Sequence, residues 1–331
     1  MDMMLEFMEQ ISQAEQIAIG GHIRPDGDCI GSCLALQQYL KKKYPKKIVD
    51  VYLEKPSSIF SYLKGFDEIN TTVSEKNYDL FLALDSSSVD RLEFSEPIFH
   101  RTKKTLCIDH HISNTYYADK TLVFPEASST SEVVYEMLLL QEKQEGKTEE
   151  EWIAWIGSEI AAAFYTGLIH DTGVFKYSNT SPRTLEIAAQ LIKTGIPFTQ
   201  IIDQSFYEKT YIQTQIMGRC LLESIRVMNG KVIFSALSQE IMKFYGASSE
   251  DLDGIIDQLR IIKGVEVAIL LHEVKTQEYK VSMRSNHTVD VQRVAVYFGG
   301  GGHKKAAGCT MQGSVYDVIN NLTGLLEEQM E

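Results

Sequence analysis

Aspartate and histidine residues gather in four short segments of the N-terminal half of this sequence. The first segment, which begins at His22 and ends at Asp28, contains one histidine and two aspartates, with Pro25 and Gly27 to bend the backbone. Hard divalent cations bind carboxylates, and imidazole is compatible with Mn²⁺, Fe²⁺ or Zn²⁺. Asp26 and Asp28 lie two positions apart and can point at different metal ions. An ordinary turn with an aspartate as helix cap is the alternative.

Two further segments place acidic and imidazole side chains directly after short apolar runs. Asp85 ends one of these runs, and the other is followed by Asp109, His110 and His111. An apolar strand that ends in aspartate puts the carboxylate at the edge of an open α/β sheet where ligands bind. One histidine can bind metal while the other faces a phosphate, and the adjacent carboxylate can orient a ligating ring. A helix cap at Asp85 and a surface turn at the histidines are the alternatives.

The fourth segment contains Asp171 and Gly173 at the end of a long apolar stretch that is expected to be helical. A carboxylate next to this apolar helix costs free energy unless it reaches solvent, is paired with another group or binds a metal ion. A simple helix end at Gly173 is the alternative. Together the four segments put candidate ligands at the ends of three strands and one helix. Two metal ions about 3.5–4 Å apart, bridged by a shared carboxylate, can activate water for phosphoryl displacement.

A glycine-rich motif in the C-terminal half indicates an anion pocket. Arg284 is followed, further along, by four glycines that begin at Gly299 and by His303. Glycines let backbone N–H groups approach an anion closely. Arginine can grip a phosphate with two hydrogen bonds, and a protonated histidine adds a donor. A flexible linker is the alternative for the glycine run.

The composition limits the class of substrate. The chain has 331 residues, which is enough for two domains, and its formal net charge is −13. An acidic protein does not suit tight binding to long duplex nucleic acid, because many phosphates must be neutralised by lysine and arginine. A small anionic substrate remains compatible, since a cluster of metal ions can reverse the charge of one pocket.

Cysteine usage and hydropathy predict a cytoplasmic protein without a membrane partner. The five cysteines are odd in number and form no CxxC pair, so we expect reduced and mostly buried thiols. The N-terminus lacks the basic start and apolar core of a signal peptide. We expect no apolar run of the roughly 18 residues that a membrane span needs.

The remaining pattern predicts two α/β domains. Apolar runs alternate with helical periods in the first half, which is typical of a doubly wound, mainly parallel sheet with helices on both faces. Ser129 and Glu132 fit a capping box at the start of one helix. The expected strands are 17–21, 48–53, 80–84 and 105–108, and the expected helices are 29–43, 129–143, 152–169 and 182–193.

A second, smaller α/β domain follows a helical stretch over 198–222. Its expected strands include the antiparallel neighbours 265–274 and 278–284, which predict a mixed sheet. Strand 231–237 and helices 249–262, 291–298 and 315–328 complete the pattern. We place the first domain at 1–195, a helical linker at 196–215 and the second domain at 216–331. The active-site cleft is expected between the two domains.

The segments together resemble the motifs of the DHH/DHHA1 phosphoesterase family over nearly the whole chain. The four DHH motifs correspond, in order, to His22 to Ser32, Asp85, Asp109-His110-His111 and Asp171. The DHHA1 signature GGGH corresponds to Gly299 to His303, which contains one extra glycine. The length most resembles the bacterial nanoRNase and pAp phosphatase branch. That branch degrades very short RNA and removes the 3′-phosphate from 3′-phosphoadenosine 5′-phosphate (pAp).

The resemblance implies two divalent metal ions, Mn²⁺ first, with Mg²⁺, Co²⁺ or Fe²⁺ as alternatives. One ion would be held by His22, Asp26 and Asp85, and the other by Asp28, Asp85, His110 and Asp171, so that Asp85 bridges. His111 would approach the scissile phosphate, with Asp109 behind it, and these two with Asp85 form the expected catalytic set. The implied substrate-binding residues are Arg284, Ser285, Gly300, Gly301, Gly302 and His303.

Several functions remain open at this point. The expected substrates are short RNA oligonucleotides or small nucleotides, but a phosphodiesterase for linear pApA or cyclic dinucleotides would use the same residues. A pyrophosphatase relative should lack the GGGH-type domain, and an exonuclease for long DNA should be longer and basic. A non-catalytic nucleotide sensor is the alternative from another class, although binding alone needs no bridging carboxylate. The sequence leaves a homodimer open.

Overall fold

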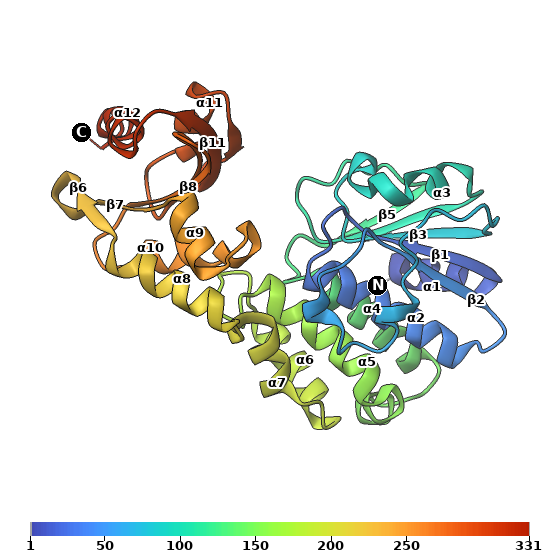
Figure 1. Cartoon of the computed structure of the whole chain (residues 1–331). Coiled ribbons are helices and arrows are strands. Elements are labelled where there is room, and N and C mark those ends of the chain that lie inside the picture. Colours follow the sequence, from blue (N-terminus) through green and yellow to red (C-terminus); the bar gives the residue numbers. More distant parts are fainter. Residues whose placement is uncertain (1, 331) are drawn as a thin grey trace. The chain divides into compact units, whose positions relative to one another are not determined.

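The computed structural model describes residues 2–330, and the chain divides into two compact units, Met1–Glu208 and Lys209–Glu331. The first unit contains the strands β1 (Gln16–Gly20), β2 (Ile48–Tyr52), β3 (Leu80–Leu84), β4 (Thr105–Asp109) and β5 (Lys120–Val123). Its helices are α1 (Asp2–Gln13), α2 (Gly27–Lys43), α3 (Glu96–Arg101), α4 (Thr130–Gln144), α5 (Glu149–Asp171), α6 (Pro182–Lys193) and α7 (Phe198–Ile202) (Figure 1).

The first sheet is entirely parallel, with the strand order β2-β1-β3-β4-β5. Its central strands β3 and β4 are buried along their whole length, as expected for apolar strands covered on both faces. Side chains alternate between the faces, so Ile17 and Ile19 of β1 join one core cluster while Ala18 joins the other. Figure 1 shows α3 on one face and α2, α4 and α5 on the other. The predicted doubly wound sheet is confirmed.

Helix α5 differs from the sequence expectation. By length and composition it is apolar enough to cross a membrane, so the expectation that no such run exists was wrong. Two-thirds of its most apolar stretch, 67%, is buried inside the protein, which is also the behaviour of a core helix. Trp152 and Phe164 of α5 are fully buried. The helix packs on α2 and α4, and Gly31 and Gly167 allow the close approach of α2 and α5.

The second unit contains a mixed sheet with the order β10-β11-β9-β8-β7-β6, in which only β7 and β8 pair in parallel. Its strands are β6 (Ile225–Val227), β7 (Val232–Leu237), β8 (Val267–Lys275), β9 (Glu278–Ser285), β10 (Gly301–His303) and β11 (Ala306–Gln312). Its helices are α8 (Tyr211–Leu222), α9 (Gln239–Tyr245), α10 (Ile255–Arg260), α11 (Val291–Tyr297) and α12 (Val315–Glu327). The predicted antiparallel pairing of β8 with β9 is confirmed.

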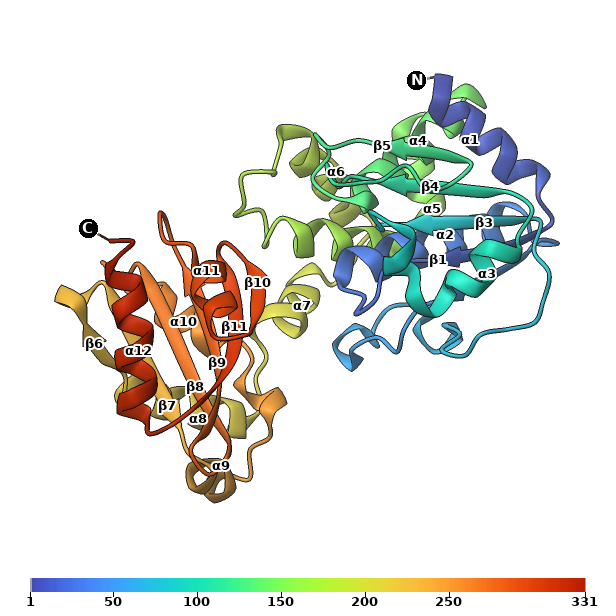
Figure 2. The same ribbon diagram turned by 90° about the horizontal axis from the view of Figure 1, so that it is seen from above.

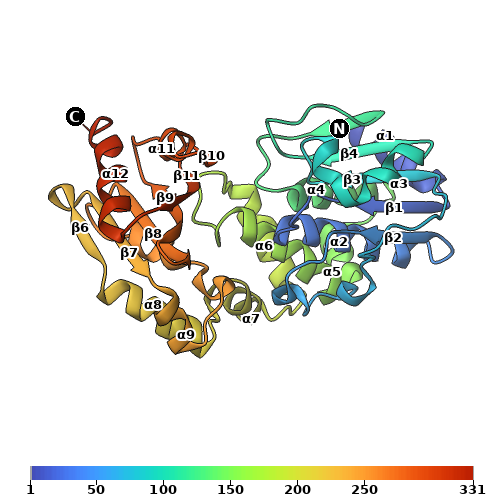
Figure 3. The ribbon, with the colours of Figure 1, turned by 45° about the horizontal axis from the view of Figure 1, so that its top comes forward.

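Both faces of the second sheet are covered by helices. Helices α11 and α12 pack on one face and α8, α9 and α10 on the other (Figures 2 and 3). The helix expected over 249–262 is broken at Gly254, which has a φ of +83°. The helical stretch expected over 198–222 is likewise interrupted, at residues 208–210, between a π-helical turn (Asp203–Tyr207) and α8.

Candidate metal centre

The candidate ligands meet at the carboxyl edge of the first sheet. Strands β1 and β3 are neighbours, but the chain leaves β1 toward β2 on one side and returns through β3 on the other. Such a reversal opens a crevice outside the strand ends. The His22 segment follows β1, Asp85 follows β3 and Asp109 ends β4, while Asp171 arrives from the end of α5.

His22 is prepared to act as a ligand through Nε2. Its Nδ1 lies 2.7 Å from the carbonyl oxygen of Ile23, and since a carbonyl only accepts, Nδ1 carries the proton. Nε2 faces two carboxylates, 3.4 Å from Oδ2 of Asp85 and 3.7 Å from Oδ1 of Asp26, and its lone pair is the one that a bound cation would use. The ring is 7% exposed, so these neighbours dominate its surroundings.

Asp85 faces imidazoles of two different loops. Its Oδ2 points toward His22, whereas its Oδ1 lies 3.8 Å from Nε2 of His110 and 3.7 Å from Nδ1 of His111. The side chain is 2% exposed. Its backbone has a φ of +54°, a conformation that costs free energy for most residues and that aspartate tolerates better than most. One carboxylate therefore stands between two sets of ligands, as a bridging role requires.

His110 and Asp171 form the second side of the cluster. Nε2 of His110 lies 2.9 Å from Oδ2 of Asp171, yet it is buried and has no aligned hydrogen-bond partner within residues 2–330. A buried nitrogen without a hydrogen bond is costly unless another partner uses its lone pair. Nδ1 of the same ring lies 3.4 Å from the carbonyl oxygen of Ala127, which suits donation by Nδ1. Nε2 of His110 thus fits a metal ligand.

Negative charge is concentrated in this cluster. Burial, followed by the charges of Asp85 and Asp171, raises the pKa of Asp28 well above its usual value. Burial lowers the pKa of His110, but proximity to Asp171 and the charges of Asp28 and Asp85 outweigh it and raise that pKa to about 10. Divalent cations would relieve this repulsion. The donor set, oxygen and imidazole nitrogen, suits Mn²⁺ and similar ions.

The ligand atoms fall into three groups in which all atoms lie within 4.8 Å of one another. Asp85 with His110 and His111 forms one group, and Asp28 with His110 and Asp171 forms another. The third joins His22 and Asp85 with the thiol of Cys29, which the sequence analysis did not single out. These groups bring together most of the expected metal ligands.

Asp26 occupies a different position from the other carboxylates. Its Oδ1 accepts the N–H groups of Asp28 at 3.0 Å and Cys29 at 3.1 Å, so it caps α2. Its side chain is 52% exposed and belongs to none of the three groups. Asp26 is thus a helix cap, and its carboxylate also lies beside His22, where it was predicted as a metal ligand.

Asp109 fixes the orientation of the His111 ring through a hydrogen bond. Its Oδ1 accepts the N–H of His110 at 2.8 Å and Nδ1 of His111 at 2.7 Å, and its Oδ2 accepts the amide of Asn114 at 2.7 Å. The carboxylate is fully buried, whereas His111 is 41% exposed. Nδ1 of His111 is therefore the donor and Nε2 is free to face a substrate. Asn114 was missed by the sequence analysis because a single asparagine in a loop carries no pattern.

The first turn of α4 closes the cluster. Ser129 caps the helix by accepting the N–H of Glu132 at 3.0 Å, as predicted. The reciprocal half of the capping box is absent, because the carboxylate of Glu132 instead accepts the hydroxyls of Ser128 at 2.5 Å and Thr184 at 2.7 Å. The bond from Thr184 ties the start of α4 to α6.

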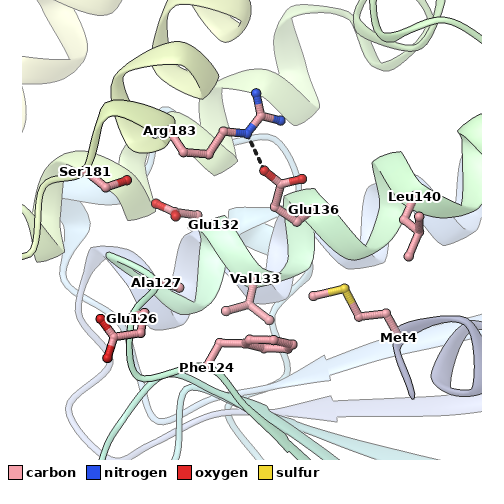
Figure 4. Close-up of a pocket in the computed structure, with 10 residues that line it drawn as sticks. All are labelled: Met4, Phe124, Glu126, Ala127, Glu132, Val133, Glu136, Leu140, Ser181 and Arg183. Carbon is pink, nitrogen blue, oxygen red and sulfur yellow. Dashed lines mark hydrogen bonds and ion pairs between the residues drawn. The ribbon is translucent and has the colours of Figure 1, made fainter. Parts of the chain in front are cut away.

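A cavity of about 550 Å³ lies on another side of α4. It is lined by Met4, Phe124, Glu126, Ala127, Glu132, Val133, Glu136, Leu140, Ser181 and Arg183 (Figure 4). Arg183 forms an ion pair with Glu136 beside it, 2.5 Å apart. None of the candidate ligands lines this cavity, so its mostly apolar space does not mark the site of the chemistry.

Gly167 of α5 is required where three elements meet at the cluster. A β-carbon at this position would lie 2.6 Å from Oδ1 of Asp28 and would collide with Oγ of Ser131. We expect Gly167→Ala to destabilise the protein by about 1–3 kcal/mol through overpacking and to weaken metal binding. Thermal denaturation and metal titration measure the two effects.

Gly324→Ala in α12 is the matched control. A β-carbon at Gly324 would meet no atom within 4 Å, so alanine should stabilise the exposed helix by about 0.5–1 kcal/mol and leave metal binding unchanged. A Gly167→Ala protein with wild-type stability and metal affinity would contradict the packing argument.

In the second unit, Arg284 and His303 lie on the same face of the sheet. His303 pairs with Ala306, and Ala306 pairs with Arg284 on its other side. Residues in register across strands point to the same face, so the two side chains are two strand spacings apart, about 9.5 Å between backbones, with a methyl group between them. This geometry leaves room for an anion between a guanidinium and an imidazole.

The glycine run is built into the sheet and is not a free linker. β-carbons at Gly300 and Gly302 would collide with the backbone of β11. The N–H groups of Gly299 and Gly300 donate to carbonyls of α11, at 3.0 and 2.8 Å, so they are not available to an anion. Gly301 is exposed on the edge strand β10. β-carbons at Gly299 and Gly301 would meet no atom within 4 Å.

Ser285 does not share the face of Arg284. Adjacent residues of a strand point to opposite faces. Its side chain is buried, and its hydroxyl donates to the carbonyl of Val289 at 2.7 Å. The structure thus gives the Ser285 hydroxyl a structural bond in the core and does not bring it to Arg284 and His303.

Comparison with known proteins agrees with the geometry of both units. Residues 16–168 match the model of the DHH family, N-terminal domain, and residues 229–331 match that of the DHHA1 domain. A protein of Thermus thermophilus named bifunctional oligoribonuclease and PAP phosphatase NrnA is 29% identical over 90% of this chain and 84% of its own length. A Bacillus subtilis protein of the same name is 26% identical over 93% of each chain.

A solved structure shares the fold. The crystal structure of an exopolyphosphatase-related protein from Bacteroides fragilis has a TM-score of 0.83 and 25% sequence identity, and the match covers 98% of this chain and 95% of that one. The candidate ligands after β1, β3 and β4 all lie inside the segment that matches the DHH model, whereas Asp171 lies three residues beyond it.

Proposed function

Because the chain belongs to the DHH family of phosphoesterases and carries a DHHA1 domain, we propose that it hydrolyses short RNA oligonucleotides to mononucleotides and pAp to AMP and phosphate. The observation that carries the proposal is the position of Asp85, with one oxygen toward His22 and the other toward His110. A carboxylate shared by two ligand sets is what a two-metal phosphoesterase needs.

The cation pair is the proposed cofactor, with Mn²⁺ as the first choice. Bound divalent ions would supply positive charge for the phosphoryl transition state and bring the pKa of water toward neutrality. His22 and Asp85 would hold one ion, with Asp26 beside them. Asp28, Asp85, His110 and Asp171 would hold the other.

The remaining residues act on the substrate. Asp109 accepts Nδ1–H of His111 and so fixes the ring with Nε2 outward. A protonated His111 would then donate from Nε2 to the scissile phosphate, where charge develops. Arg284 and His303 of the DHHA1 domain are the proposed phosphate-binding residues. Buried, free cysteines suit the cytoplasmic location that we also propose.

One panel of substrates tests this function. The metal-stripped protein is supplied with Mn²⁺ and then assayed on pAp, RNA of two to five nucleotides, linear pApA, cyclic di-AMP and pyrophosphate. We expect turnover of the short RNA and of pAp, and loss of turnover on chelation. Turnover confined to pApA or cyclic di-AMP would favour the phosphodiesterase alternative. Tight nucleotide binding with no turnover of any substrate would favour a sensor.

Arg284→Ala is expected to raise KM for pAp and dinucleotide RNA by about 10- to 100-fold, with a smaller effect on kcat, because a charge-assisted hydrogen bond contributes about 1.5–3 kcal/mol. Steady-state kinetics separates the two constants. His303→Ala should act in the same direction with a smaller magnitude.

Lys280→Ala is the control for net charge. Lys280 is exposed on the same strand, and its even spacing from Arg284 places it on the same face, away from the glycine run. Its replacement should leave KM nearly unchanged. Equal effects of the Lys280 and Arg284 variants would show that the face attracts phosphates only through its general charge.

A further inference from the structure

Three donors in the first turn of α4 contact the candidate carboxylates. The N–H groups of Thr130 and Ser131 donate to Oδ2 and Oδ1 of Asp28, at 2.6 and 2.9 Å. The hydroxyl of Thr130 donates to Oδ1 of Asp85 at 2.9 Å. Since an ionised carboxylate only accepts, the hydroxyl proton must lie on the side of Asp85. Thr130 therefore contacts two carboxylates, one in the first turn of α2 and the other directly after β3.

The start of a helix explains why these donors are available. The first N–H groups of an α-helix have no partner within the helix, and this end carries partial positive charge. Ser129 satisfies one N–H group, that of Glu132, and the two oxygens of Asp28 satisfy two others. Asp28 is fully buried, so water cannot replace these hydrogen bonds.

The surroundings leave this turn little freedom to move. Thr130 and Ser131 are fully buried, and the carboxylate of Glu132 accepts the hydroxyls of Ser128 and Thr184. The hydroxyl of Ser131 is buried without a hydrogen-bond partner within residues 2–330. It lies next to Oδ1 of Asp28, because both would touch a β-carbon at Gly167.

We propose that Thr130 is a positioning residue of the metal centre, whose hydroxyl and N–H fix the separation of Asp85 and Asp28. Asp28 belongs to one proposed ion alone, whereas Asp85 is shared by both. A bond network that holds these two carboxylates together would set where two ions can bind, and it leaves Oδ2 of Asp85 toward His22. The proposal rests on the two-metal function proposed above.

Thr130→Val tests the hydroxyl alone. Valine has the same shape and retains the backbone N–H bond to Asp28, so only the bond to Asp85 is lost. We expect the affinity for at least one Mn²⁺ to fall by about 10- to 100-fold, the usual effect of removing a group that orients a ligand. Titration with Mn²⁺ followed by electron paramagnetic resonance reports both the stoichiometry and the magnetic coupling of a close pair, without any substrate.

Two further variants separate positioning from general stability. Thr130→Ser keeps the hydroxyl and should restore Mn²⁺ affinity and coupling even though it loses a buried methyl group. Thr102→Val removes another buried threonine hydroxyl, which donates to the carbonyl of Ile98 at 2.7 Å, and should leave Mn²⁺ binding unchanged. Thermal denaturation of the three metal-free variants shows whether each one folds.

The outcomes distinguish this inference from the proposed function. A wild-type protein that binds no coupled pair of Mn²⁺ would overturn the two-metal function itself. A wild-type protein that binds the pair, beside a folded Thr130→Val variant that binds it equally well, would overturn the positioning role alone. Weak binding by both Thr130→Val and Thr130→Ser would also overturn it, since the hydroxyl would then not be the responsible group.

Discussion

Asp85→Asn is expected to lower kcat for pAp and short RNA by about 10³- to 10⁴-fold, because several kcal/mol of transition-state stabilisation by metal ions are lost at about 1.4 kcal/mol per factor of ten. Asparagine retains the shape of the side chain and tolerates the left-handed backbone conformation at this position, φ +54°. Its amide cannot provide two anionic oxygens to two ions. Steady-state kinetics at saturating Mn²⁺ measures the loss.

The same variant should respond differently without metal. In the metal-free protein the charges of Asp85 and Asp28 repel each other in a buried place, as the raised pKa of Asp28 indicates. Removing one charge should therefore stabilise the metal-free protein, while added Mn²⁺ should no longer raise its melting temperature as it does for the wild type. Differential scanning calorimetry with and without Mn²⁺ measures both effects.

Asp50→Asn is the control for the loss of a partly buried carboxylate. Asp50 lies on β2 and pairs with Lys76 at 3.0 Å, outside the cluster, so its variant should keep both activity and stabilisation by Mn²⁺. If Asp85→Asn retained a coupled Mn²⁺ pair and appreciable turnover, Asp85 would not be the bridging ligand.

The convergence of Asp85, Asp109 and the His22 segment could be predicted because strands of a parallel sheet end at a common edge. Apolar runs that stop at an aspartate carry this information in the sequence itself. Asp171 could be named as well, because a carboxylate at the end of an apolar helix needs a partner. The position of Asp85 between His22 and His110 depends on the direction of each oxygen, which the strand pattern does not contain.

Other features of the site could not be predicted from periodicity. Thr130 acts through its place in a helix turn that follows a loop, so its contacts with Asp28 and Asp85 depend on how α4 meets α2. The short strand β10 contains only glycines and a histidine, all exposed, and so offers no apolar pattern. The alternation along β9 does contain the information that Ser285 faces away from Arg284.

Two adjacent histidines make the sharpest division of roles in the proposed mechanism. His110 is nearly buried, with Nε2 beside Asp171 and Asp85, whereas His111 is 41% exposed and its Nδ1 is held by Asp109. His110→Ala should therefore remove metal binding at the second ion. His111→Ala should leave metal binding intact, because the Asp109 bond to Nδ1 and the outward Nε2 assign this ring to the substrate.

His111→Ala is expected to lower kcat by about 10²- to 10⁴-fold, the range for loss of a positioned proton donor, with little change in KM or in Mn²⁺ stoichiometry. Asp109→Asn should produce part of this loss, since an amide no longer accepts from Nδ1 with full charge and the ring can turn. His100→Ala, at an exposed histidine that bonds Glu96 on α3, controls for the loss of an imidazole elsewhere.

If His111→Ala lost an ion, or if His110→Ala kept both ions and lost only turnover, the two neighbours would have to exchange their assigned roles. The direction of each ring in the structure argues against that exchange, because of the two rings it is that of His110 whose Nε2 is buried beside Asp85 and Asp171.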